Sequence, residues 1–212
     1  MTEKTDQPPT GLFNTARLEA FSDGVFAIAI TLLVLDLAVP ARNELADRSL
    51  ASALGAEWPS YFAYLVSFAV IGIIWVNHHG MCVLVRQADR LVLFANLLLL
   101  LTVSVIPFPT RLLAEYLTSN GDSHIAAAIY SASMLAMSIA FSLLFLAISR
   151  DARLLHVPLD RFTVRRTLRR FSAGGVFYLA TIGLSFVSAV LTLIVHALLA
   201  LYYCFDQLTS AR

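Results

Sequence analysis

Hydrophobic and polar positions alternate along the chain in long blocks. Five stretches are strongly apolar, and polar segments separate them: Gly24–Val39, Trp58–Val76, Leu91–Phe108, Ile125–Ser149 and Phe171–Phe205. A helix needs about 20 residues, and at least about 17, to cross a bilayer core about 30 Å thick. The pattern therefore predicts helices that span a membrane.

The last stretch is long enough for two short spans. Its 35 residues include no Asp, Glu, Lys or Arg, and Gly183, Ser185 and Ser188 are weak turn signals inside it. We therefore expect an all-α integral membrane protein with six transmembrane helices, formed by residues 17–206.

Both ends of the chain are predicted to be short tails. Residues 1–16 are polar, contain Pro8 and Pro9, and lack the apolar core of a cleavable signal peptide, so we expect a disordered tail. Residues 207–212 form a second tail.

The basic residues are distributed unevenly over the predicted loops. With a cytoplasmic N-terminus, 12 of the 15 Lys and Arg residues fall in inner segments. Cytoplasmic loops carry an excess of these residues, so we expect both termini and both tails to be cytoplasmic. The segment from Arg150 to Arg170 holds seven of them, and Arg161–Arg170 is the densest part. This cluster is interpreted as topogenic charge, or alternatively as a site for anionic lipids or regulators.

The composition excludes several classes of protein. Hydrophobic residues make up 58% of the chain and charged residues 14%, against about 45–50% and about 25% in soluble domains. A soluble enzyme and a soluble substrate are therefore not expected, and a net charge of +1 gives no basic surface for nucleic acid. Cys82 and Cys204 show no pairing pattern of a disulfide framework. Fourteen Arg and one Lys, in an Ala- and Leu-rich chain, are typical of a GC-rich bacterial genome.

Charged residues crowd the inner end of the first span. Span 1 opens at Arg17, so Arg17, Glu19 and Asp23 lie at the inner end of a helix that is apolar from there on, and Trp75-Val76-Asn77-His78-His79 lies at the same depth at the inner end of the second span. Buried polar groups between helices need hydrogen-bond partners, so a polar knot between the two spans is one interpretation. The other is that they are ordinary residues at headgroup level.

One face of the first span is apolar apart from a hydroxyl. Ile28, Thr31, Leu32 and Leu35 follow the spacing i, i+3, i+4 and i+7. Such a face is typical of a helix-packing seam, a lipid contact or a pore lining, and the spacing alone does not distinguish these three. Asp36 follows at the outer end, where it either concentrates cations or is an interfacial residue.

The remaining polar residues indicate no metal or enzyme chemistry. His78 and His79 point in different directions on a helix, no third ligand accompanies them, and no HExxH pattern occurs. We find no set of nucleophile, base and orienting residue, so we expect neither a cofactor nor an enzyme. Asn96 is interpreted as a helix-packing residue of the third span, and the lone His196 of the last span stays unassigned.

Several of these residues form a recognisable signature. Arg17-x-x-x-Phe21-Ser22-Asp23-Gly24, Trp75-x-Asn77-His78-His79 and Pro107-Phe108-Pro109-Thr110 resemble the prokaryotic branch of the transmembrane protein 175 family. Members are potassium-permeable channels without the TVGYG filter of ordinary potassium channels, and this sequence lacks TVGYG as well. The resemblance implies a leak-type potassium channel in the bacterial plasma membrane.

The resemblance also implies an assembly and a set of functional residues. One FSD motif per chain, where animal relatives carry two repeats, implies a single repeat and a homotetramer. The first span would line the pore, with constrictions at Ile28, Leu32 and Leu35 and a ring of hydroxyls at Thr31. The implied polar network between helices comprises Arg17, Phe21, Ser22, Asp23, Trp75, Asn77, His78 and His79.

An ion-coupled or proton-permeable secondary transporter is the alternative. It would need a midplane site with charged or unwound segments. The chain has no acidic residue central to a span and no pair of helices interrupted by Gly or Pro.

Overall fold

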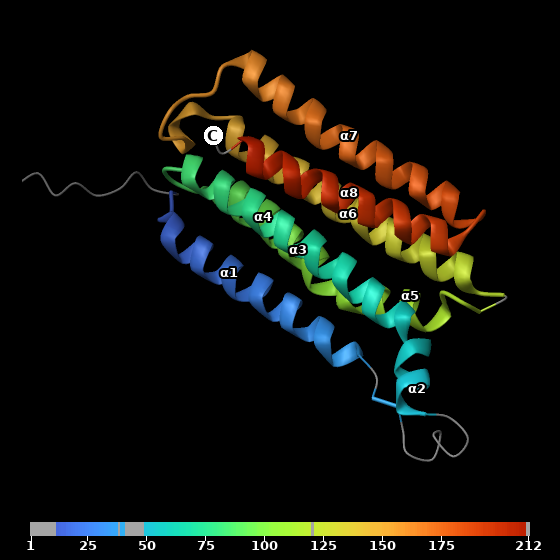
Figure 1. The fold of residues 1–212 in the computed structure, drawn as a ribbon. Helices are drawn as coiled ribbons and strands as arrows, with labels where there is room; N and C mark the ends of the chain where they lie inside the picture. The colour runs from blue at the N-terminus through green and yellow to red at the C-terminus, as the bar shows by residue number, and fades with distance from the viewer. Residues whose placement is uncertain (1–11, 38, 41–48, 120, 211–212) are drawn as a thin grey trace, which may run out of the picture.

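The protein is a bundle of long helices that run up and down beside one another (Figure 1). The structure is a computed structural model, and it describes residues 12–37, 39–40, 49–119 and 121–210, the last six by their backbone alone. The α-helices are α1 (Thr15–Leu32), α2 (Leu50–Ala56), α3 (Trp58–Leu84), α4 (Arg90–Val105), α5 (Pro107–Tyr116), α6 (Ser123–Ser149), α7 (Arg161–Ser185) and α8 (Ala189–Ser210). Two 3₁₀ turns, η1 (Leu33–Asp36) and η3 (Ala152–Leu154), extend α1 and follow α6.

The predicted fold class is confirmed as all-helical with apolar helices of membrane-spanning length. Four segments of the described chain are long and apolar enough to cross a bilayer: Thr15–Asp36, Trp58–Leu84, Arg90–Tyr116 and Ser123–Ser149. The apolar part of α8, Ala189–Cys204, is shorter, and α7 carries the arginine cluster in its first three turns. The number of six spans stays a prediction.

Two helices are longer than the apolar stretches that predicted them. The apolar stretch starts at Gly24 and the first span was predicted to open at Arg17, whereas α1 begins at Thr15, because Asn14 caps it: the Asn14 Oδ1 accepts a hydrogen bond of 2.9 Å from the backbone nitrogen of Ala16. α3 continues to Leu84, beyond the apolar stretch that ends at Val76 and beyond His79, the last residue of the predicted inner end. Polar side chains do not end a helix, so hydropathy marks the apolar part of a helix and not its bounds.

The arginine-rich segment before the last stretch is also helical. α7 begins at Arg161 and not at Phe171, with Asp160 as its cap: the Asp160 Oδ1 accepts a bond of 3.0 Å from the backbone nitrogen of Thr163. The break between the last two helices falls at residues 186–188, next to the predicted turn signals Ser185 and Ser188.

The predicted tails differ from the structure at their inner ends. Residues 1–11 and 211–212 lie outside the described residues. Phe13, however, pairs with Ala88 in an antiparallel bridge, with backbone N···O distances of 2.7 and 3.0 Å, and α1 starts two residues later. At the other terminus α8 continues past residue 206 to Ser210.

The described chain begins and ends at one end of the bundle, here called the terminal end (Figure 1). Backbone contacts tie the loops together there. The nitrogen of Arg86, in the α3–α4 loop, donates to the oxygen of Leu154 over 2.7 Å, and the nitrogen of His156 donates to the oxygen of Leu84 over 3.0 Å. These bonds satisfy backbone groups where helices stop.

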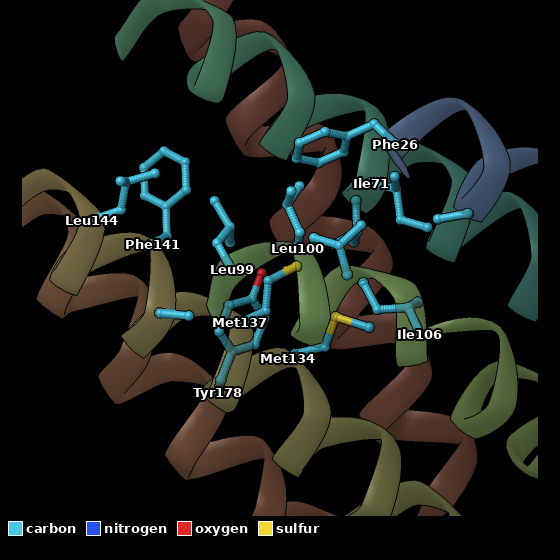
Figure 2. Packing of buried hydrophobic residues seen from close by; sticks show 14 of the residues in the cluster. Phe26, Ile71, Leu99, Leu100, Ile106, Met134, Met137, Phe141, Leu144 and Tyr178 are labelled. Carbon is cyan, nitrogen blue, oxygen red and sulfur yellow. The ribbon is translucent and has the colours of Figure 1, made fainter. Parts of the chain in front are cut away.

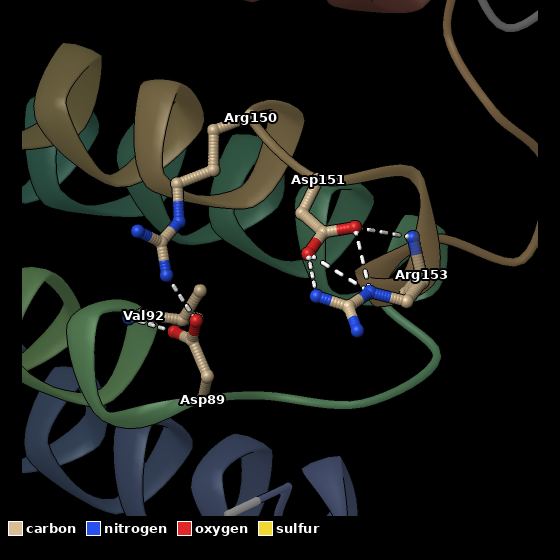
Figure 3. A network of polar contacts seen from close by, with 5 residues as sticks. All are labelled: Asp89, Val92, Arg150, Asp151 and Arg153. Atoms are coloured by element: carbon tan, nitrogen blue, oxygen red, sulfur yellow. Dashed lines mark hydrogen bonds and ion pairs between the residues drawn. The ribbon is translucent and has the colours of Figure 1, made fainter.

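Two ion pairs add to this arrangement (Figure 3). Arg150, after α6, pairs with Asp89, whose other oxygen caps α4 by accepting from the backbone nitrogen of Val92 over 3.0 Å. Asp151 accepts hydrogen bonds from the side chain and backbone of Arg153, and these lower the pKa of Asp151 to about 2. The second pair is exposed, so it contributes little stability.

Packing around α6 divides the bundle into two sides. α1 packs on α3 and α4, whereas α7 packs on α6 and α8. Figure 2 shows the core between them, where Phe26 of α1, Leu99 of α4 and Met137 of α6 are buried together. α1 and α7 therefore lie on opposite edges of the protomer (Figure 1).

Candidate functional site

The two sides of α1 differ in burial. Ser22, Phe26, Ala29 and Leu33 are at most 1% exposed. They recur at intervals of three or four residues, so they share one face, which packs on α3 and α4. The buried side of α1 thus fixes the helix to the bundle.

The opposite side of α1 carries the predicted stripe of Ile28, Thr31, Leu32 and Leu35. Ile28 is 60% exposed and Leu35 is 75% exposed, and Thr31 and Leu32 are exposed as well. Exposed apolar side chains that form one continuous stripe mark a contact surface with lipid, another protein or a pore. Within the described protomer, nothing covers this stripe.

Thr31 is the one hydroxyl on this stripe. Its Oγ1 donates a hydrogen bond of 2.9 Å to the backbone oxygen of Ile28, one turn earlier. A hydroxyl has one proton and two acceptor lone pairs. With its proton directed to the backbone, the Thr31 oxygen keeps its lone pairs free to accept.

A buried polar cluster, here called the polar anchor, joins three helices at the base of α1. It consists of Ser22 (α1), His78 (α3) and Asn96 (α4), each at most 1% exposed. The Asn96 Nδ2 donates to the Ser22 Oγ over 3.0 Å, and the His78 Nε2 lies 2.8 Å from the Asn96 Oδ1. The Ser22 hydroxyl donates to the backbone oxygen of Leu18 over 2.8 Å.

The directions of these bonds fix the form of His78. Because the Asn96 amide nitrogen donates to Ser22, its carbonyl oxygen accepts, and the His78 Nε2 must carry the proton. The other ring nitrogen, Nδ1, then accepts from the Cys82 thiol at 3.7 Å. Every member has a partner while His78 is neutral, which is the condition for burying polar groups between helices.

Exposed pairs reinforce the same contact between α1 and α3. The Trp75 Nε1 donates to the Asp23 Oδ1 over 2.9 Å. The His79 Nδ1 lies 3.1 Å from the Glu19 Oε1, and the rings of Trp75 and His79 stack with centroids 6.2 Å apart. Both acidic residues of α1 therefore contact α3.

The predicted network is thus brought together in part. Ser22, Asp23, Trp75, His78 and His79 take part in the contacts between α1 and its neighbours. The other three predicted members are Arg17, Phe21 and Asn77.

Arg17, Phe21 and Asn77 lie elsewhere. Arg17 is exposed at the start of α1 and makes no hydrogen bond or ion pair to the other members within the described residues, and Phe21 is 58% exposed. Asn77 donates to the backbone oxygen of Ile73 over 3.0 Å and faces a cavity away from α1.

Asn96 is the member that the sequence did not reveal. It had been interpreted as a packing residue of an apolar span, yet it is the only described residue that contacts both Ser22 and His78 by hydrogen bonds. Glu19, the partner of His79, was also absent from the predicted network. A signal for Asn96 did exist, since a lone amide in an apolar helix must find a partner.

A polar cavity lies at the far end of α1. It has a volume of about 580 Å³, and it is lined by the half-buried Asp36, by Glu57 and Glu115, and by one cation, Arg111. Its acidic groups outnumber its basic group, so its electrostatic potential favours cations.

His196 lies in the core of the other side of the bundle. Its Nδ1 donates to the backbone oxygen of Thr192 over 2.9 Å, and its ring stacks on Tyr178 and meets the edge of Tyr130. Its Nε2 has no partner among the described atoms. In the described part of the chain, no three His, Cys, Asp or Glu residues are arranged to hold a metal ion.

Comparisons with known proteins point to one family of ion channels. The family described as endosomal/lysosomal potassium channel TMEM175 matches residues 17–107. A potassium channel of Streptomyces collinus is 52% identical over 193 residues, 91% of this chain and 93% of that one. An endosomal/lysosomal proton channel TMEM175 of Gallus gallus is 41% identical over 106 residues, 47% of this chain and 21% of that one.

A solved structure shares the fold. The crystal structure of a lysosomal potassium-selective channel TMEM175 homolog from Chamaesiphon minutus has a TM-score of 0.82 at 42% identity, covering 91% of this chain and 97% of that one. These relatives are ion channels by name. The match to the Streptomyces protein spans nine tenths of both chains, the family match begins at Arg17 and includes the polar anchor, and on these grounds the chain belongs to the TMEM175 family.

Proposed function

We propose that this chain is a subunit of a leak-type potassium channel in a bacterial plasma membrane. The observation that carries the proposal is the uncovered stripe of Ile28, Thr31, Leu32 and Leu35 on a helix whose other side is fixed to the bundle. The names of the bacterial relatives support potassium as the permeant ion.

The pore forms between four copies of the chain. One stripe does not enclose a pathway, but copies related by a closed symmetry axis place equivalent stripes around it. The position of α1 at one edge of the protomer supports this arrangement (Figure 1). Each subunit crosses the bilayer six times, and the terminal end faces the cytoplasm, in keeping with the excess of arginine in loops at that end.

Ile28, Leu32 and Leu35 form successive apolar rings in this pore. A narrow apolar ring excludes water until it widens, so it gates conduction by dewetting, and a passing cation must lose part of its hydration shell. Potassium holds its water less tightly than sodium, so dehydration favours potassium without a cage of carbonyl oxygens. The lone pairs of Thr31 replace part of the lost hydration.

Two further features serve the pore. Asp36, in the acidic cavity at the outer mouth, raises the local concentration of cations. The polar anchor holds the inner end of α1 against α3 and α4, so that the apolar rings keep their register.

A proton-permeable or ion-coupled transporter is the second candidate. It is favoured by the name of the vertebrate relative and by the buried His196, whose Nε2 has no partner among the described atoms. An ionisable group inside a membrane bundle is a default candidate for proton transfer.

Reversal potentials in proteoliposomes test the proposal. The purified protein is reconstituted, and current is recorded under opposed potassium and sodium gradients and, separately, under a proton gradient. A channel gives a reversal potential near the potassium equilibrium potential with no second gradient. A potential that follows the proton gradient, or flux that needs two gradients, would overturn the proposal.

A further inference from the structure

The outward side of α7 changes from charged to apolar along the helix. Its exposed residues recur with the period of the helix, at i, i+3, i+4 and i+7 and then at i+14 and i+15: Phe162, Arg165, Arg166, Arg169, Val176 and Phe177. The buried residues of α7, which include Gly174 and Tyr178, lie on the other side. The three arginines of this outward side, Arg165, Arg166 and Arg169, are here called the arginine face.

The arginine face is not used inside the protein. All three side chains are exposed, and within the described residues they make no hydrogen bond or ion pair. The nearest carboxylates along the chain are engaged, since Asp160 caps α7 and Asp151 pairs with Arg153. Arg170 differs, because it lines the cavity between α3 and α7 and interacts within the protein, so it is not part of the arginine face.

The arginine face lies beside the end of a helix of membrane-spanning length. Phe171 of α7 packs on Phe141 and Phe145 of α6, with ring centroids 5.0 and 5.5 Å apart. α7 runs back along α6, which ends at Ser149, so the residues before Phe171 pass the last turns of α6 (Figure 1). α6 is long and apolar enough to cross a bilayer. The arginines therefore lie where such a bilayer has its headgroups.

Exposed aromatic side chains lie near the same level. Phe162 is 72% exposed beside the arginines. Tyr202 of α8 is 64% exposed, and its neighbour Tyr203 approaches α7 one turn beyond the arginines, where a Cβ at Gly174 would lie 2.9 Å from the Tyr203 Oη. Amphipathic aromatic residues are enriched where a membrane meets water. The change from charged to apolar on α7 thus coincides with an aromatic level.

We propose that the arginine face docks on a surface of anionic phospholipid headgroups. Its guanidinium groups contact the lipid phosphates, and Val176 and Phe177, on the same side of α7, contact the acyl chains. Arginine suits this role because its apolar stem lies along apolar surface while its planar head donates paired hydrogen bonds to a phosphate. The face lies on the edge of the protomer opposite the α1 stripe, so this inference does not depend on the proposed pore (Figure 1).

Lipid titration followed by native mass spectrometry tests the inference on the purified full-length protein in mild detergent. Phosphatidylglycerol is the anionic probe, and phosphatidylcholine of equal chain length is the zwitterionic control. We expect phosphatidylglycerol to bind the wild type at least about tenfold more tightly. The preference should shrink as ionic strength rises, because salt screens exposed charges. Equal binding of both lipids, or a preference that salt leaves unchanged, would overturn the proposal.

Two variants matched in charge locate the preference. Arg165→Gln with Arg169→Gln removes two charges of the arginine face, whereas Arg86→Gln with Arg90→Gln removes two exposed arginines at the same end of the bundle, before and at the start of α4. One arginine near an anionic surface strengthens binding about fivefold. We therefore expect the first variant to weaken phosphatidylglycerol binding by at least about tenfold and the second by about threefold or less. Equal losses would show that net charge, and not the arginine face, attracts the lipid.

Arg165→Lys with Arg169→Lys separates charge from structure. Lysine keeps the positive charge, so we expect phosphatidylglycerol affinity within about threefold of the wild type. Both side chains are exposed, so all variants should keep the wild-type elution volume in size-exclusion chromatography. A loss as large as that of the glutamine variant would contradict electrostatic docking. If the glutamine variant does not fold, the salt dependence of the wild type still decides.

Discussion

Asn96 on α4 donates a hydrogen bond of 3.0 Å to the Ser22 hydroxyl on α1, and its amide oxygen meets His78 of α3 at 2.8 Å. One side chain thereby joins the helix that carries the α1 stripe to both of its supports. All three residues are buried, so none can replace a lost partner with bulk water.

Asn96→Leu is expected to destabilise the protein. The change leaves the Ser22 hydroxyl without its donor and His78 without its acceptor, at a cost of about 1–2 kcal/mol. Thermal unfolding in detergent measures it. Thr102→Val on the same helix is the control, because the Thr102 hydroxyl donates only to the backbone oxygen of Leu99. Similar Tm values for the two variants would show that the polar anchor is not a stabilising contact.

The purified protein is expected to be a tetramer. One α1 stripe per chain requires copies around an axis, so native mass spectrometry in mild detergent should give about four times the subunit mass of 23.2 kDa. A stable monomer or dimer in every mild detergent would refute the proposed pore.

Ile28→Asn and Leu35→Asn are expected to increase basal current and to weaken discrimination against sodium. A polar side chain wets the apolar ring, and the ion then passes with more of its water. Basal leak and reversal potential in proteoliposomes measure the two effects.

Leu33→Asn is the control for these pore variants. Leu33, in the turn η1 that extends α1, is 0% exposed on the side opposite the stripe, so the change buries an amide in the core and should reduce the yield of folded protein without a leak. If Leu33→Asn leaks and the other two behave as the wild type, the pore lies on another face of α1.

Thr31→Val is expected to reduce potassium preference without opening the pore. Valine keeps the size and the branched shape of threonine but removes the oxygen lone pairs that we assign to the permeant ion. The potassium-to-sodium permeability ratio should fall while basal leak stays near the wild-type value. An unchanged ratio would remove Thr31 from the selectivity mechanism.

The α1 stripe could be predicted from the sequence, because its period of three and four residues is also the period of the helix. Ile28, Leu32 and Leu35 are all exposed on one side, as this period requires. The structure describes a single chain, so it does not show what contacts the α1 stripe in an assembly, and the pore-lining role of the stripe stays a prediction.

The contacts of the polar residues were predictable only in part. Asp23 and Trp75 lie at matching depths in consecutive spans, and depth is available from the sequence. The orientation of a side chain around its helix axis is not available from the sequence. Asn77 and His78 are adjacent, yet Asn77 faces a cavity and His78 faces the core. Orientation depends on how the helices pack.

The predicted start of the helix α7, at Phe171, was wrong for a different reason. Hydropathy measures the preference of a segment for lipid, whereas arginine is a good helix former in water. The arginines from Arg161 to Arg170 therefore lower the hydropathy of α7 without ending the helix.

The separation of the two sides of α1 has a consequence for how such a protein changes over time. Ile28 and Leu35 are exposed in their own subunit, so substitutions there leave the folding of each subunit nearly unchanged, and in the proposed tetramer they would alter the wall of the pore. Ser22, Phe26 and Leu33 are buried, so substitutions there would disturb the packing of the subunit. If the proposed pore is correct, permeation can be tuned by substitutions on one face of a single helix, and a lineage can acquire a new conductance without changing the packing of each subunit.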